Sequence, residues 1–399
     1  MKKSTLLFVT ILISFFPFGD LFAKGKVKVD KALEHAARQY LYMRSELQGS
    51  NQFPKTYDKH MQRLKTSNSE WWCSGFYPGT LWYLYEYTGD EQLKDMASRM
   101  SDRVEIQKYN KDNHDVGFMI NCSFGNKYRL LGDTSCIDII TTTARSLSTR
   151  YRSAVGCTRS WSHPGTLHWQ FPVIIDNMMN LELLCRATEF SGDKSFYDMA
   201  ISHADKTMAN HFRPDYSCYH VVNYDTISGN ALQKCTWQGY ADESVWSRGQ
   251  SWALYGYTMM YRETKQPRYL EQARHIARFL INHPKMPQDK IPYWDFDDPG
   301  VPNVLRDASA AAIMASALLE LSGYVDKATG QDYIAVAETQ LKTLASDEYL
   351  AKPGENANFI LKHSVGFLPQ NSEVDVPLTY ADYYFVEALM RYRAMCLKE

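Results

Sequence analysis

A short unit recurs along the chain, and it restricts the folds that the chain can adopt. In its clear copies an aromatic-rich apolar segment ends in a Gly/Asp turn, and an amphipathic segment follows. The Gly can adopt the left-handed conformation that ends a helix, and the Asp can cap the next helix. Each copy therefore predicts two helices joined by a short turn. Clear copies lie at 83–97, 128–140 and 187–200, and looser copies lie at 261–273 and 319–337.

Two kinds of helix alternate between these turns. A helix with almost no charge is buried on all sides, whereas an amphipathic helix covers a surface. Six buried helices alternating with six covering helices predict an all-α fold, an (α/α)6 barrel, as a single domain over residues 24–399. A two-domain helical protein is the alternative. The expected inner helices begin near residues 74, 115, 172, 247, 307 and 379, and the expected outer helices cover 29–48, 90–107, 133–150, 193–211, 266–283 and 329–346.

This arrangement predicts that the conspicuous polar and aromatic residues gather at one end of the barrel. Short Gly/Asp turns close one end, so the longer connections and the N-termini of the inner helices meet at the other. The gathering follows from topology and does not by itself assign a role to any residue. The residues at or just before an expected inner helix are Trp72, Asp115, Asp176, Arg248, Asp307 and His363.

The N-terminus has the features of a secretory signal peptide. Lys2 and Lys3 precede an apolar run over 6–16, and a possible cleavage point follows Ala23. The run is too short to cross a bilayer as a permanent anchor. We therefore expect residues 1–23 to be removed and the protein to be exported, to the periplasm or beyond the cell, without insertion into a membrane.

Charge and cysteine usage exclude several classes of function. The chain has 44 Lys and Arg against 45 Asp and Glu, with no polybasic run, so we expect no binding of nucleic acid. A chain of this length does not need covalent cross-links, and we expect its eight cysteines to be mainly buried thiols. No Cys-x-x-Cys occurs and no His/Cys cluster has zinc-ligand spacing, so neither a metal nor a cofactor is expected.

The segment 237–257, WQGYADESVWSRGQSWALYGY, combines aromatic rings with planar hydrogen-bonding groups. A sugar ring presents apolar C–H faces and a rim of hydroxyl groups, and such a segment suits both. Arg248 adds a fork that fits a carboxylate. A buried aromatic helix behind an ordinary surface turn is the alternative interpretation, and both remain open on these residues alone.

Two carboxylates lie on successive inner helices. Asp115, in NHDVGF, has the position of an ordinary helix cap. Asp176, in FPVIIDNMMN, follows Pro172, which is expected in a first helical turn, and isoleucines and methionines surround it. An apolar setting raises the pKa of a carboxyl group and lets it act as a general acid. Paired carboxylates indicate glycosidic chemistry, and Trp161, in SWSHPG, either walls a sugar subsite or packs locally.

Six motifs stand in order over residues 70–394: WWCSGFYPGTLWYLYEYTGD, NHDVGF, IIDNMMNLELL, YADESVWSRGQSWALYG, RDASAAAI and EVDVPLTYADYYFVEAL. Together they resemble the unsaturated glucuronyl hydrolases, glycoside hydrolase family 88. This resemblance implies an (α/α)6 barrel and the hydration of a C4=C5 vinyl ether in an unsaturated uronic acid. It implies that Asp176 protonates C4 and activates the water, and that Asp115 is the second essential carboxylate.

The same resemblance implies a set of substrate-binding residues. Arg248 suits the uronate carboxylate or the orientation of its neighbours, and Trp252 is expected to stack on the sugar ring. The loop 362–376 is expected to set sulfate and linkage preference, with Lys362 and Ser364 as candidate sulfate ligands. The implied binding residues are His220, Gln238, Arg248 and Trp252, with Trp72, Phe118 and Trp161 as ring contacts.

Three other functions are compatible with parts of this pattern. Unsaturated rhamnogalacturonyl hydrolases share the barrel and the chemistry but act on pectin fragments, whereas the doubled tryptophan at 71–72 and the NHDVGF context favour the glucuronyl branch. An inverting glycosidase or sugar epimerase is a second alternative, and a non-catalytic glycan-binding protein is a third. The two inner-helix carboxylates favour an enzyme. Heparin- or chondroitin-derived oligosaccharides bearing an unsaturated uronate are the expected substrates.

Overall fold

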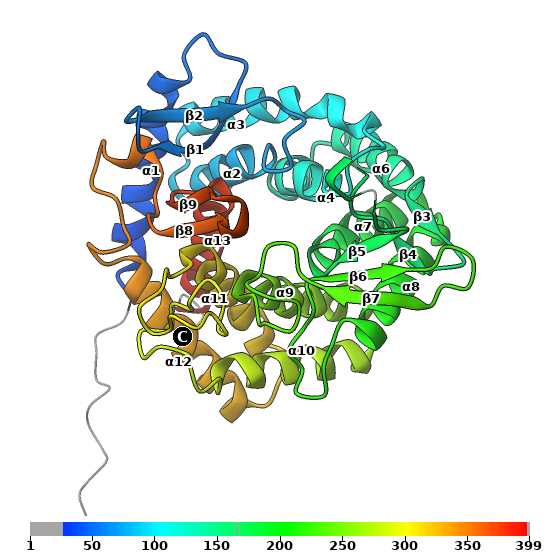
Figure 1. The fold of residues 1–399 in the computed structure, drawn as a ribbon. Helices are drawn as coiled ribbons and strands as arrows, with labels where there is room; N and C mark the ends of the chain where they lie inside the picture. The colour runs from blue at the N-terminus through cyan, green and yellow to red at the C-terminus, as the bar shows by residue number, and fades with distance from the viewer. Residues whose placement is uncertain (1–26, 163, 167, 397–399) are drawn as a thin grey trace, which may run out of the picture.

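The computed structural model describes residues 27–396 except 163 and 167, and its main helices form two concentric rings (Figure 1). The predicted (α/α)6 barrel is confirmed. The inner ring contains α2 (Phe76–Thr88), α4 (Val116–Ile120), α7 (Leu181–Ser191), α9 (Ser247–Thr264), α11 (Ala308–Ser322) and α13 (Thr379–Cys396). The outer ring contains α1 (Val29–Glu46), α3 (Glu91–Val104), α6 (Ser135–Ser148), α8 (Lys194–Asn210), α10 (Pro267–Ile281) and α12 (Lys327–Leu344). The expected signal peptide at 1–23 lies outside the described residues.

Burial separates the two rings as the charge pattern predicts. Helix α11 buries almost every residue, because alanine, isoleucine, leucine and methionine surround its axis. Helix α3 buries one face, which carries Leu93, Met96 and Met100, and leaves its charged face in solvent. A helix that is apolar all round has to be covered on every side, and an amphipathic helix provides that cover.

Gly/Asp turns close one end of the barrel. Gly89 and Gly192 end α2 and α7 in the left-handed conformation, with φ of 67° and 73°. The Asp90 and Asp193 side chains then accept hydrogen bonds from backbone N–H groups in the first turns of α3 and α8. These caps satisfy donors that a helix start would otherwise leave unpaired.

Antiparallel strands, which the helical pattern does not reveal, occupy the opposite end of the barrel. They pair as β1–β2, β3–β4, β5–β6–β7 and β8–β9. The expectation that Pro172 begins a helix was wrong: Pro172 pairs with Asn223 in an edge strand, where proline is tolerated. The strands are β1 (Phe53–Asp58), β2 (Arg63–Ser67), β3 (Tyr151–Arg152), β4 (Cys157–Thr158), β5 (Pro172–Ile174), β6 (Val221–Tyr224), β7 (Ala231–Cys235), β8 (Ser364–Phe367) and β9 (Ser372–Val376).

Two inner helices are interrupted near their N-termini. The inner segment that begins with α4 runs through a π-helical turn, η2 (Asn121–Gly125), into α5 (Asn126–Leu131). Helix α7 is entered through a 3-10 segment, η4 (Ile175–Asn180). Such irregular turns are frequent at functional sites. The remaining short turns are η1 (Glu105–Tyr109), η3 (Pro164–Thr166), η5 (Asn356–Asn358) and η6 (Leu368–Gln370).

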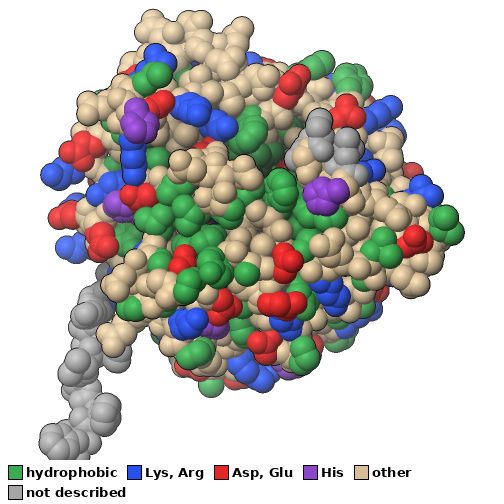
Figure 2. Space-filling view, in the orientation of Figure 1, with side chains coloured by type: hydrophobic (Ala, Val, Ile, Leu, Met, Phe, Trp, Pro, Cys, Tyr) green, Lys and Arg blue, Asp and Glu red, His purple; other side chains and the backbone are tan. Residues whose placement is uncertain are grey.

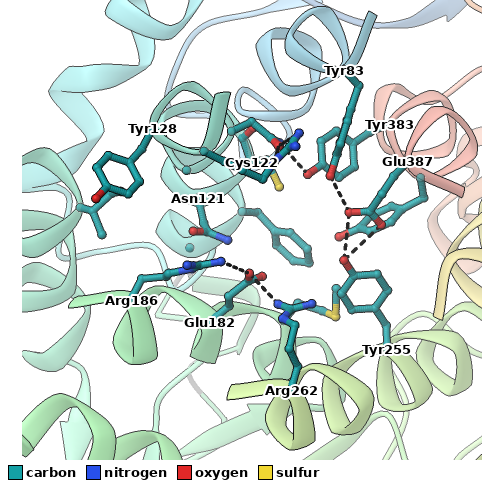
Figure 3. Close-up of a pocket in the computed structure, with 18 of the residues that line it drawn as sticks. Tyr83, Asn121, Cys122, Tyr128, Glu182, Arg186, Tyr255, Arg262, Tyr383 and Glu387 are labelled. Atoms are coloured by element: carbon teal, nitrogen blue, oxygen red, sulfur yellow. Dashed lines mark hydrogen bonds and ion pairs between the residues drawn. The ribbon is translucent and has the colours of Figure 1, made fainter. Parts of the chain in front are cut away.

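Buried charges tie the inner helices together toward the closed end, around a cavity of about 310 Å3 (Figure 3). Arg262 of α9 contacts Glu182 at 2.6 Å and Glu320 of α11 at 3.0 Å. Arg391 of α13 contacts Glu320 at 2.8 Å. Glu387 of α13 accepts hydrogen bonds from tyrosines of α2 and α9. We define these four residues of α9, α11 and α13, namely Arg262, Glu320, Glu387 and Arg391, as the closed-end charge cluster.

Two further features bear on the sequence expectations. Seven of the eight cysteines, all except Cys396, are buried free thiols. Within residues 27–396, apart from the two positions not described, no helix combines the length and apolarity that crossing a membrane requires.

Candidate active site

A cleft of about 880 Å3 opens at the end of the barrel where the inner helices begin. Figure 2 shows this face, with hydrophobic side chains gathered near its middle. Five of the predicted site residues line the cleft: Trp72, Asp115, Trp161, Gln238 and Arg248.

The other four predicted site residues, Asp176, Phe118, His220 and Trp252, lie directly behind the lining. Phe118 contacts Trp72 of the wall, with 5.6 Å between ring centroids, and its own ring lies 5.2 Å from that of Trp252. Asp176 and His220 contact each other, and His220 contacts Trp161 of the wall. Residues from 72 to 252 therefore meet at one end of the barrel, as the topology predicts.

Asp176 faces a histidine whose proton position follows from its hydrogen bonds. His220 Nδ1 accepts backbone N–H groups of Trp237 and Gln238, each at 3.1 Å. A neutral imidazole that accepts at Nδ1 carries its proton on Nε2, and this Nε2 lies 3.7 Å from Asp176 Oδ2. Burial lowers the pKa of His220 well below its usual value, so the ring is neutral at physiological pH. His220 therefore directs an N–H toward the Asp176 carboxyl group.

Burial also changes the proton affinity of Asp176. The residue is 9 % exposed, and loss of solvent raises its pKa to about 7. Arg248 and the Trp252 side chain oppose this rise. A carboxyl group with a pKa near neutrality can donate a proton and later accept one at physiological pH, which is the requirement for general acid/base catalysis.

Asp115 stands at the N-cap position of α4, but its side chain does not cap the helix. Its Oδ1 accepts a hydrogen bond from Asn180 Nδ2 at 3.3 Å and lies 3.3 Å from His114 Nε2. Burial and the nearby Asp176 raise the pKa of Asp115 to about 8. The ordinary capping role that the sequence left open is therefore excluded, and the carboxyl group is oriented toward the cleft that it lines.

Asn180 connects the two carboxylate-bearing segments and was missed by the sequence analysis. It lies one turn after Asp176, accepts the backbone N–H of Phe118 at 3.0 Å, and donates to Asp115. Gly117 makes this approach possible, because a Cβ at position 117 would lie 2.5 Å from Asn180 Oδ1. The only sequence signal was an Asn four residues after one Asp and a Gly two residues after the other.

Arg248 holds the wall of the cleft as well as lining it. Its guanidinium lies 3.2 Å from Asp307, donates to the backbone carbonyl of Val365, and donates to that of Gly366 at 2.6 Å. Gln238 donates to the same Gly366 carbonyl at 3.2 Å. Arg248 was expected either to bind the uronate carboxylate or to orient its neighbours. The structure shows the second of these contacts directly.

The two expected sulfate ligands, Lys362 and Ser364, lie outside the cleft. Lys362 donates to the backbone carbonyl of Asp347, and Ser364 is fully buried, so neither lines the cleft. His363 is paired with Asp375 at 2.6 Å and does not line the cleft either. The reason is the β8–β9 hairpin, which turns the start of the loop 362–376 inward. This hairpin instead presents Gly366, Phe367, Ser372 and Glu373 to the cleft.

The aromatic residues form two layers. Trp72 and Trp161 are partly exposed and line the cleft. Phe118 and Trp252 are 2 % and 0 % exposed. The expectation that Trp252 offers a free face to the sugar ring was wrong, since neighbouring rings cover it. Trp252 supports the front layer and approaches Asp176, whereas Trp72 and Trp161 reach the cleft itself.

The arrangement can bind a sugar acid and move a proton. It combines two buried carboxyl groups of raised pKa, a neutral histidine, a buried arginine and an aromatic wall. Among the residues that the structure describes, no group of His, Cys, Asp or Glu side chains is placed to hold a metal ion.

Comparison with known proteins gives consistent matches over almost the whole chain. Residues 46–392 match glycosyl hydrolase family 88. An unsaturated glucuronyl hydrolase of Formosa agariphila is 44 % identical over 97 % of this chain and 98 % of its own length. An unsaturated chondroitin disaccharide hydrolase of Streptococcus agalactiae is 31 % identical over 92 % of each protein. A solved unsaturated glucuronyl hydrolase specific for heparin superposes with a TM-score of 0.89 and 49 % identity, covering 92 % of this chain and 98 % of that one.

Proposed function

Because the chain belongs to glycosyl hydrolase family 88, and is a glycoside hydrolase of unsaturated uronate-bearing glycosaminoglycan fragments, we propose a role for each carboxylate and a preferred substrate. The enzyme removes the 4,5-unsaturated uronic acid from the non-reducing end of lyase-generated oligosaccharides. Asp176 is the general acid/base, and Asp115 is the second essential carboxylate. The observation that supports this assignment is the contact between Asp176 and His220. Both residues are buried, and the Asp176 carboxyl group faces an N–H of the neutral His220 ring.

The reaction begins with protonation of a double bond. C5 of the unsaturated ring carries the ring oxygen, so a proton added to C4 leaves an oxocarbenium ion at C5. Asp176 supplies this proton, since its raised pKa keeps the carboxyl group protonated near neutral pH. The Asp176 carboxylate then takes a proton from water as the water adds to C5. The resulting hemiketal opens, and C1 expels the rest of the sugar chain.

The binding groups fit the charges of this reaction. Asp115 lines the cleft close to Asp176 and is placed to form hydrogen bonds with ring hydroxyls. Trp72 and Trp161 offer partly exposed ring faces to the sugar, and Gln238 adds a hydrogen-bonding side chain. Arg248 is positioned near Asp176, and its positive charge favours a bound uronate.

A direct assay tests the assignment. The purified protein is incubated with unsaturated disaccharides from heparin, chondroitin, hyaluronan and pectin, and loss of the enoate absorbance is followed. Asp176→Asn is expected to lower kcat by about 100-fold or more, because general acid/base catalysis contributes about that much. Asp193→Asn, at an exposed helix cap where Asn is equally suitable, is the control and keeps wild-type turnover. Wild-type turnover by Asp176→Asn would contradict the proposed role.

We further propose that heparin-derived disaccharides are preferred over chondroitin-derived ones. The heparin-specific relative is 49 % identical, whereas the chondroitin disaccharide hydrolase is 31 % identical. The ratio of kcat/KM for the two disaccharides in the same assay measures this preference. A ratio below one reverses the proposal without affecting the assigned chemistry.

Export remains part of the proposed function. Lyase products accumulate where polysaccharides are cut, and the N-terminal segment 1–23 has the pattern of a signal peptide. Sequencing of the mature N-terminus is expected to begin at Lys24.

A further inference from the structure

The cleft continues beyond the carboxylates to an apolar surface at its outer end. Ile106 and Tyr109 both line the cleft, and each is 61 % exposed. They lie in the 3-10 turn η1, in which side chains three residues apart share one face. We call these two residues the outer platform. A large exposed tyrosine beside an exposed isoleucine suits the apolar C–H face of a sugar ring.

Exposure orders the cleft from inside to outside. Asp115 and Arg248 are 9 % and 1 % exposed and mark the inner end, whereas the outer platform is open to solvent. The cleft volume of about 880 Å3 is near the upper end of the range of about 300–1,000 Å3 that holds a drug-sized ligand. A sugar whose reacting ring lies against Asp115 therefore leaves room farther out in the same cleft.

A lysine stands beside the platform with its charge available. Lys111 lines the cleft, is exposed, and makes no ion pair with the part of the chain that the structure describes. The neighbouring Lys108, by contrast, is paired with Glu105 at 2.7 Å. The exposed carboxylate of Asp112 also lines the cleft and offers acceptors for sugar hydroxyls.

The loop that carries Lys111 is held by its own hydrogen bonds. Asn110 Oδ1 accepts the backbone N–H groups of Asp112 and Asn113 at 2.9 and 3.1 Å. Arg150 donates to the Lys111 carbonyl at 2.7 Å. A fixed backbone lowers the entropy cost of placing the lysine against a ligand.

We propose that the outer platform and Lys111 form a subsite for the third sugar of an unsaturated glycosaminoglycan tetrasaccharide, counted from the non-reducing end. Uronic acids alternate with amino sugars in these polymers, so the third sugar carries a carboxylate. Lys111 binds this carboxylate, and Tyr109 and Ile106 contact the ring. This inference rests on the proposed function, because it requires that the first sugar be the unsaturated uronate near Asp176.

The test compares a tetrasaccharide with the disaccharide of the same linkage and sulfation. The wild-type protein is expected to have a severalfold higher kcat/KM for the tetrasaccharide, and Tyr109→Ala and Lys111→Ala each bring this ratio toward one. Lys111→Arg retains most of the preference. Tyr42→Ala, at a tyrosine 50 % exposed on the outer helix α1, is the matched control and leaves the ratio unchanged. Added salt lowers the ratio in the wild type and has less effect in Lys111→Ala, since the contact is exposed.

The outcomes separate the two proposals. If the disaccharide is hydrolysed but Tyr109→Ala and Lys111→Ala keep the wild-type ratio, the outer subsite is wrong and the proposed function stands. A wild-type ratio of one likewise overturns the subsite alone. If neither oligosaccharide is hydrolysed, the proposed function fails and the subsite fails with it.

Discussion

Burial and hydrogen bonding set the protonation states of His220 and Asp176 in different ways. The backbone fixes which nitrogen of His220 carries the proton, and burial keeps the ring neutral. The same burial raises the pKa of Asp176. Histidine thus provides a directed donor without a charge, and the carboxyl group keeps a proton that an exposed aspartate would have lost.

The raised pKa values predict how activity depends on pH. Under the proposed assignment, Asp176 must be protonated before it can donate to C4, and burial raises the pKa values of Asp176 and Asp115 to about 7 and about 8. We expect kcat/KM to fall as pH rises through this range, and the falling limb belongs to the coupled pair. The measurement is kcat/KM from pH 5 to 9, with preincubation at each pH to exclude denaturation. A profile that stays flat up to pH 9 would contradict the assignment.

Residue types with strong chemical character were predictable from the sequence. Asp115, Asp176 and Arg248 stand out because charge next to an apolar helix needs a reason. Asn180 does not stand out, since a neutral amide inside a helix start has many ordinary explanations. The burial of Trp252 was also not predictable, because the sequence shows that a ring is present but not which neighbours cover it.

Among the elements, the junction between α4 and η4 has the greatest influence on the site. Each segment carries one of the two carboxylates, and Asn180 joins them through the backbone of Phe118 and the side chain of Asp115. Gly117 sets the spacing, since no side chain fits between the segments there. The geometry of the two carboxylates therefore depends on a glycine that does not itself line the cleft.

Gly117→Ala is expected to separate the two carboxylates. The added Cβ would lie 2.5 Å from Asn180 Oδ1 and 2.7 Å from Asn180 Cα, so one segment has to move. We expect kcat to fall on the order of 100-fold, the typical effect of a displacement of about 1 Å. Gly323→Ala is the control, because a Cβ there meets its nearest atom at an ordinary 3.5 Å. Unchanged kcat in a folded Gly117→Ala protein would show that the junction tolerates the strain.

Elements with a repeated signal were predictable, and short ones were not. The Gly/Asp turns marked the helices, because the capping residues lie at fixed positions beside apolar periodicity. The three-residue strand β5 has no such signal, and an apolar run such as FPVII fits a buried strand as well as a helix. Tertiary pairing with β6 decides between them.

At the scale of the whole molecule, the two ends of the barrel differ in how their buried ionisable groups are arranged. The open end holds buried carboxyl groups of raised pKa, whereas the closed end holds the closed-end charge cluster, in which opposite charges are paired. Burying charges is costly unless they are paired, and removing one partner leaves the others uncompensated. The closed end therefore stabilises the ring while the open end retains its reactive groups.

Glu320→Ala tests the closed-end charge cluster. Burial opposes ionisation of Glu320, but Arg391 and Arg262 lower its pKa below the usual value near 4.5. Its contribution to stability is therefore present above that value and is lost as pH falls through the folded-state pKa. We expect Glu320→Ala to cost about 3–5 kcal/mol of unfolding free energy at neutral pH.

Denaturant unfolding at pH 7 and pH 4 measures this effect, and the difference from the wild type is expected to shrink at the lower pH. Glu271→Ala, which removes one side of an exposed pair with Arg274, is the control and changes stability by about 0.5 kcal/mol or less. Equal losses in the two variants would contradict the role of the cluster.

The hydrogen bonds to His220 also affect how such an enzyme can evolve. They come from the main chain of Trp237 and Gln238, and every amino acid except proline supplies that N–H group. Mutation can therefore replace the side chains of this cleft-lining loop while the proton on His220 keeps its place. Substrate preference can therefore change during evolution through those side chains, while the orientation of His220 is inherited unaltered.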